Sequence, residues 1–255
     1  MKSFDHKSGQ YIKIDDAEIY YEEIGKPDGH VILMLHGGLG NIAHFNNILP
    51  YIPDKFRVIG IDSRGHGKST LGSKELTYAL LQEDIEYILN ILGINRLSII
   101  GFSNGGTISY RIASCATFKI DHLVTIGAPW NNKHLEHILP SFSKLNVEEW
   151  IKQSPNDYKE YQELNPERDI NRIFKFCINL ALDKNSSRPG DIVKNINCPI
   201  LAIRGDKDFV VSQDNIEELS RLGKNTSILN IRDAGHEAII DQPEMVARAI
   251  LNLIN

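Results

Sequence analysis

The pentapeptide Gly101-Phe102-Ser103-Asn104-Gly105 lies between two segments of different character. Residues 97–100 before it are a short apolar, branched run that predicts a buried strand, and residues 106–113 after it predict a helix. A serine on so sharp a turn has strained backbone geometry, and the residues two positions away on each side must be almost free of side chain. Gly101 and Gly105 meet that demand, so the pentapeptide predicts a nucleophile elbow centred on Ser103.

Further short apolar segments predict that the elbow belongs to a mostly parallel sheet. Continuous apolar strands are buried on both faces, as they are in parallel sheets whose strands alternate with helices. Residues 11–15 and 18–24 alternate in part between polar and apolar and predict an antiparallel opening. Helical spacing of apolar residues predicts a helix from Thr77, a candidate N-cap, to Gly93, a candidate C-cap. The remaining expected strands are 31–35, 56–61, 123–126, 199–203 and 227–231, and the remaining expected helices are 213–222 and 243–254.

The alternation of strands and helices is interrupted after Pro129. Residues 130–189 are charged, rich in aromatic residues and helical in pattern, which predicts a helical lid inserted late in the sheet. The expected core then consists of residues 1–129 and 190–255. Alternating strands and helices with one helical insertion predict an α/β fold with a cap.

The composition excludes several classes of function. A formal net charge of -5 and a sequence pI near 6.0, without a basic run, provide no general attraction to nucleic acid or to an anionic membrane. The cysteines have no C-x-x-C spacing, which indicates reduced thiols, and no metal site is expected. The first residues lack the apolar segment of a signal peptide, and no apolar run is long enough to span a bilayer, so a cytoplasmic location is expected.

A serine nucleophile needs a base that removes its proton and a carboxylate that orients the base, in the order serine, acid, histidine behind an elbow of this kind. His236 is the best candidate for the base, because it follows a glycine in a loop directly after a predicted strand. The acid is expected in the loop after residues 199–203, where Asp206 and Asp208 compete. Residues two apart in a turn can point either way, so the spacing leaves this choice open.

Two backbone N–H groups are also needed to bind the oxyanion that forms during acyl transfer. Asn104, the residue after the nucleophile, supplies the first. The segment 36–40, His-Gly-Gly-Leu-Gly, follows a predicted strand and supplies the second, best from Gly38, because glycine lets the backbone approach a substrate closely. Gly38 and Asn104 therefore form the expected oxyanion hole.

Taken together, these segments resemble the α/β-hydrolase fold superfamily over essentially the whole chain. The resemblance implies that Asp208 rather than Asp206 is the catalytic acid, and it implies the same oxyanion hole. It also implies roles in turns and packing for Asp62, Arg64 and His66. The matching landmarks, in chain order, are residues 36–40, the loop 62–69 (Asp-Ser-Arg-Gly-His-Gly-Lys-Ser), the elbow 101–106, residues 205–208 (Gly-Asp-Lys-Asp) and residues 235–236 (Gly-His).

The activity implied by the resemblance is that of a serine hydrolase that cleaves a small acyl ester through Ser103, His236 and Asp208, without a metal or an organic cofactor. Dehalogenases and epoxide hydrolases of this fold carry Asp at the position of Ser103, so neither activity is expected. Proline iminopeptidases carry H-G-G-P-G at the position of residues 36–40, and its absence here disfavours that activity. The elbow is most similar to the G-W/F-S-D-G-G form of small esterases similar to biphenyl-hydrolase-like proteins, with neutral Asn104 in place of Asp, which argues against cationic amino-acid esters.

Other functions stay open at this point. The same triad suits a thioester, lactone or C–C substrate, an acyltransferase or a perhydrolase, and the non-enzymatic alternative is a ligand-binding protein on a hydrolase scaffold. The expected partner is a small acyl compound, and a homodimer also stays open.

Pockets of this fold lie between cap and catalytic face and are mostly apolar, so lid aromatics either line the pocket or join the lid helices together. The candidate lining residues are Trp130, Phe142, Trp150, Phe174 and Phe176.

Overall fold

One sheet runs through the structure, a computed structural model that describes residues 1–115, 117–182 and 187–255. Within these ranges the sheet has eight strands in the order β1-β2-β4-β3-β5-β6-β7-β8. β2 pairs antiparallel with both β1 and β4, whereas the other neighbours are parallel. The expected α/β class, with a mostly parallel sheet and an antiparallel opening, is confirmed. The strands are β1 (Gln10–Ile14), β2 (Ala17–Gly25), β3 (Val31–Leu35), β4 (Arg57–Ile61), β5 (Arg96–Phe102), β6 (Lys119–Ile126), β7 (Ile200–Gly205) and β8 (Thr226–Ile231).

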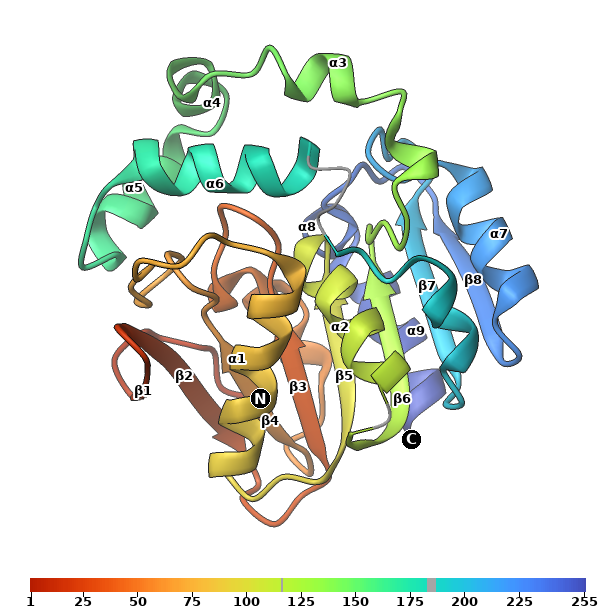
Figure 1. Ribbon diagram of the computed structural model, residues 1–255. Helices are drawn as coiled ribbons and strands as arrows, with labels where there is room; N and C mark the ends of the chain where they lie inside the picture. Colours follow the sequence, from red (N-terminus) through yellow and green to blue (C-terminus); the bar gives the residue numbers. More distant parts are fainter. Residues whose placement is uncertain (116, 183–186) are drawn as a thin grey trace.

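Helices cover both faces of the sheet, because successive residues of a strand point to opposite sides. Along β3, Leu33 and Leu35 pack in the core layer that contains α1 and α2, and Ile32 and Met34 pack in the layer that contains α9 (Figure 1). No helix in the described ranges combines the length and the apolar composition needed to cross a bilayer. The helices are α1 (Tyr78–Ile91), α2 (Asn104–Cys115), α3 (Leu139–Phe142), α4 (Val147–Gln153), α5 (Pro155–Leu164), α6 (Ile170–Leu182), α7 (Gln213–Leu222), α8 (Ala238–Asp241) and α9 (Pro243–Ile254), with 3-10 helices at Ile42–Asn47, Leu49–Tyr51, Lys133–Leu135 and Gly190–Asn195.

The start of α1 has the cap expected from the sequence, and the C-cap is Leu92, one residue before the expected Gly93. Thr77 Oγ1 accepts a hydrogen bond from the backbone N–H of Leu80 at 3.0 Å. Gly93, just after the helix, has a φ of +67°, a conformation that glycine adopts without strain from a Cβ. β6 begins earlier than expected, at Lys119, because Lys119 and Ile120 extend its parallel pairing with β5.

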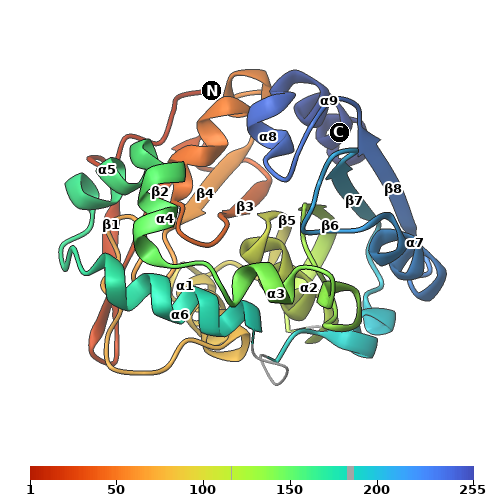
Figure 2. The same ribbon diagram turned by 90° about the horizontal axis from the view of Figure 1, so that it is seen from above.

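A layer of helices, α3 to α6, lies between β6 and β7 in the sequence and above the end of the sheet at which α2 begins (Figure 1 and Figure 2). We call this layer the lid; residues 183–186 of the segment expected to form it lie outside the described residues. Asn165, which is 1% exposed, ties the lid to the loop after β4. Its Nδ2 donates to the carbonyl oxygens of Gly65, Gly67 and Ser69 at 3.2, 3.1 and 3.0 Å.

Candidate active site

Ser103 lies on the turn between β5 and α2 with a backbone φ of +51°. This left-handed conformation strains a residue that has a Cβ. The turn leaves no space for neighbouring side chains, because a Cβ on Gly101 would lie 2.4 Å from Ser109 Oγ and a Cβ on Gly105 would lie 2.0 Å from the carbonyl oxygen of Leu35. The strained, glycine-flanked turn expected from the sequence is therefore present.

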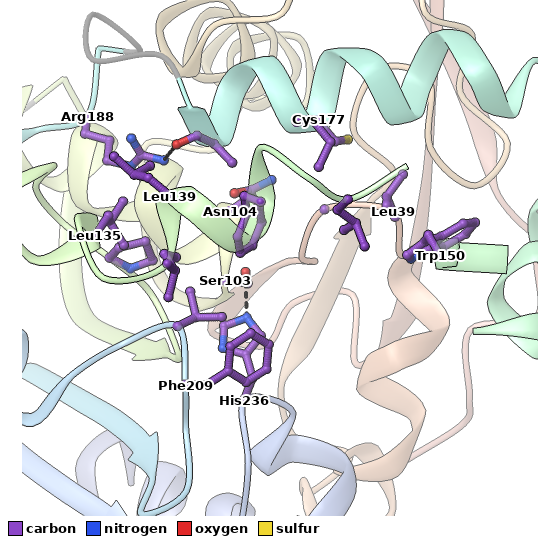
Figure 3. A pocket seen from close by; sticks show the side chains of 18 residues that line it. Leu39, Ser103, Asn104, Leu135, Leu139, Trp150, Cys177, Arg188, Phe209 and His236 are labelled. Carbon is purple, nitrogen blue, oxygen red and sulfur yellow. Dashed lines mark hydrogen bonds between the residues drawn. The ribbon is translucent and has the colours of Figure 1, made fainter. Parts of the chain in front are cut away.

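A chain of hydrogen bonds joins Ser103, His236 and Asp208, which come from three separate loops. Ser103 Oγ lies 3.0 Å from His236 Nε2 (Figure 3), and His236 Nδ1 lies 3.1 and 3.2 Å from the two carboxylate oxygens of Asp208. The three loops follow β5, β7 and β8, whose carboxyl ends lie at the same edge of the parallel part of the sheet. When Nδ1 carries the proton and donates to the carboxylate, Nε2 is left as an acceptor for the serine proton.

Asp208 is 6% exposed and is held by its own loop. Its Oδ1 accepts hydrogen bonds from the backbone N–H groups of Val210 and Val211 at 2.8 and 3.0 Å. Burial disfavours the charged form, but the hydrogen bond and charge of His236, together with the two N–H groups, outweigh it and lower the pKa of the Asp208 carboxyl below its ordinary value. A carboxylate that is ionised at neutral pH therefore faces the imidazole.

Asp206, the competing aspartate, bonds the backbone instead of His236. Its Oδ1 accepts a hydrogen bond from the backbone N–H of Ala234 at 3.3 Å. Backbone hydrogen bonds, first that of Asp233, lower the pKa of this carboxyl. The tertiary structure thus separates two aspartates that the spacing alone left open.

Gly38 and Asn104 lie against each other beside Ser103, and both line the same cavity. A Cβ on Gly38 would lie 2.6 Å from Asn104 Nδ2, so a larger residue there would displace the amide. Asn104 is the first residue of α2, and the first N–H groups of a helix have no acceptor within the helix. Backbone donors of this kind are what an oxyanion hole requires.

The geometry of the neighbouring loops depends on buried histidines and on Asp62. His36 Nδ1 lies 2.7 Å from the carbonyl oxygen of Gly37, and His36 Nε2 accepts the backbone N–H of Ser63 at 2.9 Å. Burial and the nearby His66 lower the pKa of His36 to about 3, so its ring is neutral at neutral pH. The side chain of Asp62 accepts backbone hydrogen bonds from the loops after β3 and β4. These contacts hold backbone in place, in agreement with the role in turns and packing expected for Asp62.

A cavity of about 220 Å³ opens beside Ser103 and His236 under the lid (Figure 3). Phe142 and Trp150, two of the aromatic residues expected to line it, do so. The walls are mostly aliphatic and aromatic, and such a cavity suits an apolar group next to the nucleophile. The other residues between 135 and 181 that line it are Leu135, Ile138, Leu139, Leu145, Cys177, Ile178 and Ala181.

The other three aromatic residues expected to line the cavity lie elsewhere. Trp130 is 1% exposed, and its Nε1 donates to the carbonyl oxygen of Asn215 at 2.8 Å, so it packs the start of the lid segment against α7. Phe174 is buried against Trp150, with ring centroids 6.2 Å apart. Phe176 is two residues from the cavity-lining Ile178 on α6, and residues two apart on a helix point in directions about 200° apart.

Sequence patterns did not indicate Leu39, Phe209 or Arg188, which also line the cavity. Leu39 has a left-handed φ of +59° between two glycines. Phe209 is 66% exposed, and its ring centroid lies 6.2 Å from that of His236. In the sequence, only its position directly after Asp208 could have indicated that Phe209 lines the cavity. Arg188 comes from the chain after α6, and nothing in its local sequence indicates that it reaches the cavity.

The chain is similar to known hydrolases over most of its length. Residues 30–153 match the family model of the alpha/beta hydrolase fold. A Haemophilus influenzae protein whose name places it among esterases and lipases is 25% identical over 239 residues, which cover 88% of this chain and 83% of that protein.

Two solved structures share the fold. A carboxylesterase of the thaumarchaeon Nitrososphaera gargenis superposes with a TM-score of 0.78 at 20% identity, covering 95% of this chain and 97% of the other. The meta-cleavage product hydrolase of Pseudomonas fluorescens superposes with a TM-score of 0.80 at 18% identity, covering 98% and 99%. The family match includes the elbow, and the shared fold extends over nearly all of both chains: this protein has the α/β-hydrolase fold.

Proposed function

We propose that this protein is a serine hydrolase that cleaves small acyl esters. The observation that carries the proposal is the hydrogen-bond chain from Ser103 through His236 to Asp208 at the wall of an apolar cavity. Serine is a weak nucleophile at neutral pH unless a base takes its proton. His236 Nε2 is within hydrogen-bond reach of that proton, and Asp208 stabilises the imidazolium that forms.

The reaction has two steps with the same proton path. Ser103 Oγ attacks the ester carbonyl carbon while its proton passes to His236 Nε2, and His236 then returns the proton to the leaving alcohol as the C–O bond breaks. Water attacks the resulting acyl-enzyme, again giving a proton to His236, and the acid leaves as Ser103 regains its hydrogen. The N–H groups of Gly38 and Asn104 bind the oxyanion of each tetrahedral intermediate.

The size of the cavity limits the acyl group. An apolar cavity of about 150 Å³ holds a benzene molecule, and the cavity beside Ser103 is about 220 Å³. A short aliphatic or single-ring acyl group therefore fits beside Phe142 and Trp150, whereas a long lipid chain requires the lid to move.

The charge of the cavity favours a neutral ester over the terminal amine of a peptide. Asn104 is neutral, and the cavity-lining residues that the structure describes include no Asp or Glu to bind an ammonium group. A cation in such a site loses hydration without gaining an ion pair. The Haemophilus influenzae relative and the archaeal carboxylesterase, both named for action on esters, support the same choice.

A fluorophosphonate probe, which forms an adduct with activated serines, tests the proposal. We expect an adduct on Ser103 of the folded protein and hydrolysis of p-nitrophenyl acetate, and we expect Ser103→Ala to abolish both. A wild-type protein that neither labels nor hydrolyses the ester would contradict the proposal. A competing alcohol separates hydrolysis from transfer, because an ester product would identify an acyltransferase and the free acid identifies a hydrolase.

A further inference from the structure

The side chain of Asn104 is held by a residue that the proposed mechanism does not use. Tyr78, the first residue of α1, donates from its hydroxyl to Asn104 Oδ1 at 2.8 Å. The exposed fraction of Tyr78 is 0%, so bulk water has no access to replace this hydrogen bond. The oxygen of the Asn104 amide is therefore occupied on the side away from the substrate.

The positive charge of Arg188 favours this direction of the hydrogen bond. Its guanidinium lies over the Tyr78 ring, with Cζ 5.2 Å from the ring centroid. A cation attracts the oxygen of a nearby hydroxyl and repels its one hydrogen. Tyr78 thus turns its hydrogen away from Arg188 and toward Asn104, which favours the amide oxygen, and not the NH2 group, on the Tyr78 side.

The NH2 group of the same amide is left for the cavity. Asn104 lines the cavity beside Ser103 (Figure 3), and its Nδ2 is the atom that a Cβ on Gly38 would meet at 2.6 Å. Rotating the amide by 180° would exchange an NH2 donor for an oxygen acceptor with little change in shape. The contact with Tyr78 decides between these two orientations.

We propose that Tyr78 is a positioning residue that presents the Asn104 NH2 group to the substrate, and that the site thereby selects acyl groups with a neutral oxygen acceptor close to the scissile carbonyl, such as 2-alkoxy or 2-oxo esters. This inference rests on the proposed function and names the substrate class of that site. An ether or keto oxygen pairs with the NH2 group, whereas a saturated chain of equal size leaves the donor desolvated and unpaired.

Two p-nitrophenyl esters of equal acyl length measure this selection. Methoxyacetate carries an ether oxygen where butyrate carries a methylene. We take the ratio of kcat/KM for methoxyacetate to kcat/KM for butyrate and divide it by the same ratio of the hydroxide-catalysed hydrolysis rates. This normalised ratio is free of the difference in intrinsic reactivity. We expect a normalised ratio above one for the wild type. Tyr78→Phe lets the amide rotate and should lower the ratio about fivefold, the loss that one hydrogen bond brings.

Tyr110→Phe is the matched control. Tyr110 is equally buried, its hydroxyl lies 2.6 Å from Thr125 Oγ1, and neither residue is among those that line the cavity. Both Phe variants lose one buried hydroxyl, but only Tyr78→Phe should change the normalised ratio.

Asn104→Asp provides a second test if Tyr78→Phe does not fold. It keeps the shape of the side chain and puts a carboxylate oxygen in place of the NH2 group, so it should lower the ratio by about tenfold or more.

The outcomes separate this inference from the proposed function. If the wild type is active and has the same normalised ratio as Tyr78→Phe, the inference is overturned and the proposed function stands. Where Tyr78→Phe does not fold, the same comparison is made with Asn104→Asp. A fall in the ratio of Tyr110→Phe equal to that of Tyr78→Phe would also overturn the inference. A wild type that hydrolyses neither ester would overturn the proposed function and this inference with it.

Discussion

Two histidine–aspartate pairs in this protein have nearly the same geometry in different surroundings. His236 Nδ1 lies 3.1 Å from Asp208 Oδ1, and His6 Nε2 lies 3.0 Å from Asp62 Oδ2. The histidine side chain is 18% exposed in the first pair and 5% exposed in the second. His236 presents its second ring nitrogen to Ser103 beside a cavity, whereas the ring of His6 stacks on a buried tyrosine.

A histidine–carboxylate hydrogen bond therefore does not by itself identify a catalytic site. Asp62 also accepts the backbone N–H groups of Ile42 and Lys68, so it joins three separate parts of the chain. Burial lowers the pKa of His6, but the hydrogen bond and charge of Asp62 outweigh it and raise that pKa above its ordinary value. The pair of His6 and Asp62 is thus a buried hydrogen-bonded pair with a structural role, and of the two histidines only His236 has Ser103 and a cavity on its free side.

The largest difference between the two pairs is expected when each histidine is replaced by alanine. His236→Ala removes the proposed base, and kcat for p-nitrophenyl acetate should fall by about a million-fold, because the members of such a unit act together. His6→Ala should leave kcat close to the wild-type value and lower the free energy of unfolding. Steady-state kinetics and urea unfolding of both variants measure the contrast, and an equal loss of kcat in both would contradict it.

The next largest effect is expected at the acid. Asp208→Asn keeps the shape of the side chain but favours the wrong tautomer of His236, and kcat should fall by about ten-thousand-fold. Asp206→Asn is the matched control two residues away and should keep kcat close to the wild-type value, because Asp206 bonds the backbone N–H of Ala234 and not His236. A larger loss in Asp206→Asn, measured with the same ester, would reverse the assignment of the acid.

Asp62→Asn should act on stability instead of on chemistry. The exposed fraction of Asp62 is 0%, and removing its charge weakens its hydrogen bonds to His6 and to two backbone N–H groups. The free energy of unfolding should fall by about 1–3 kcal/mol, the cost of leaving a buried hydrogen-bonding group unsatisfied. The folded fraction should still react with the fluorophosphonate probe at the wild-type rate. Slower labelling of Asp62→Asn with unchanged urea unfolding would show that this pair serves the chemistry.

The smallest effect concerns His36, a buried histidine without a carboxylate partner of its own. Its pKa is about 3 in the folded protein and about 6.5 in the unfolded chain. Between these values only the unfolded state binds the proton, so the stability that the neutral ring provides is present above about pH 6.5 and is lost as the pH falls.

His36→Gln removes this titration while keeping an acceptor for the N–H of Ser63. Between about pH 6 and pH 4, the slope of the free energy of unfolding against pH should become less steep by about 1.4 kcal/mol per pH unit. Urea unfolding at several pH values measures the slope. An unchanged slope would mean that His36 takes up its proton equally in both states.

The elbow was predictable because its requirements are local. A strand followed by a helix, with Ser103 between two glycines, is visible in neighbouring residues, and the left-handed φ of +51° follows from that turn. The choice between Asp206 and Asp208 was not predictable from spacing, because side chains in an irregular turn have no fixed direction. The resemblance to a family selected Asp208, and the packing of the loop after β7 against the loop after β8 brings its carboxylate to His236.

Lid residues were the least predictable part of the site. Trp130 and Trp150 are both aromatic residues of the predicted lid segment, and the sequence predicts the same role for both. Trp130 packs against α7, whereas Trp150 lines the cavity. Periodicity and glycine requirements are properties of short segments, so they were sufficient for the α/β architecture and for the chain order of the reacting groups. The direction of a lid side chain and the contact between Tyr78 and Asn104 depend on how elements distant in the chain pack together, and no local pattern encodes those distances.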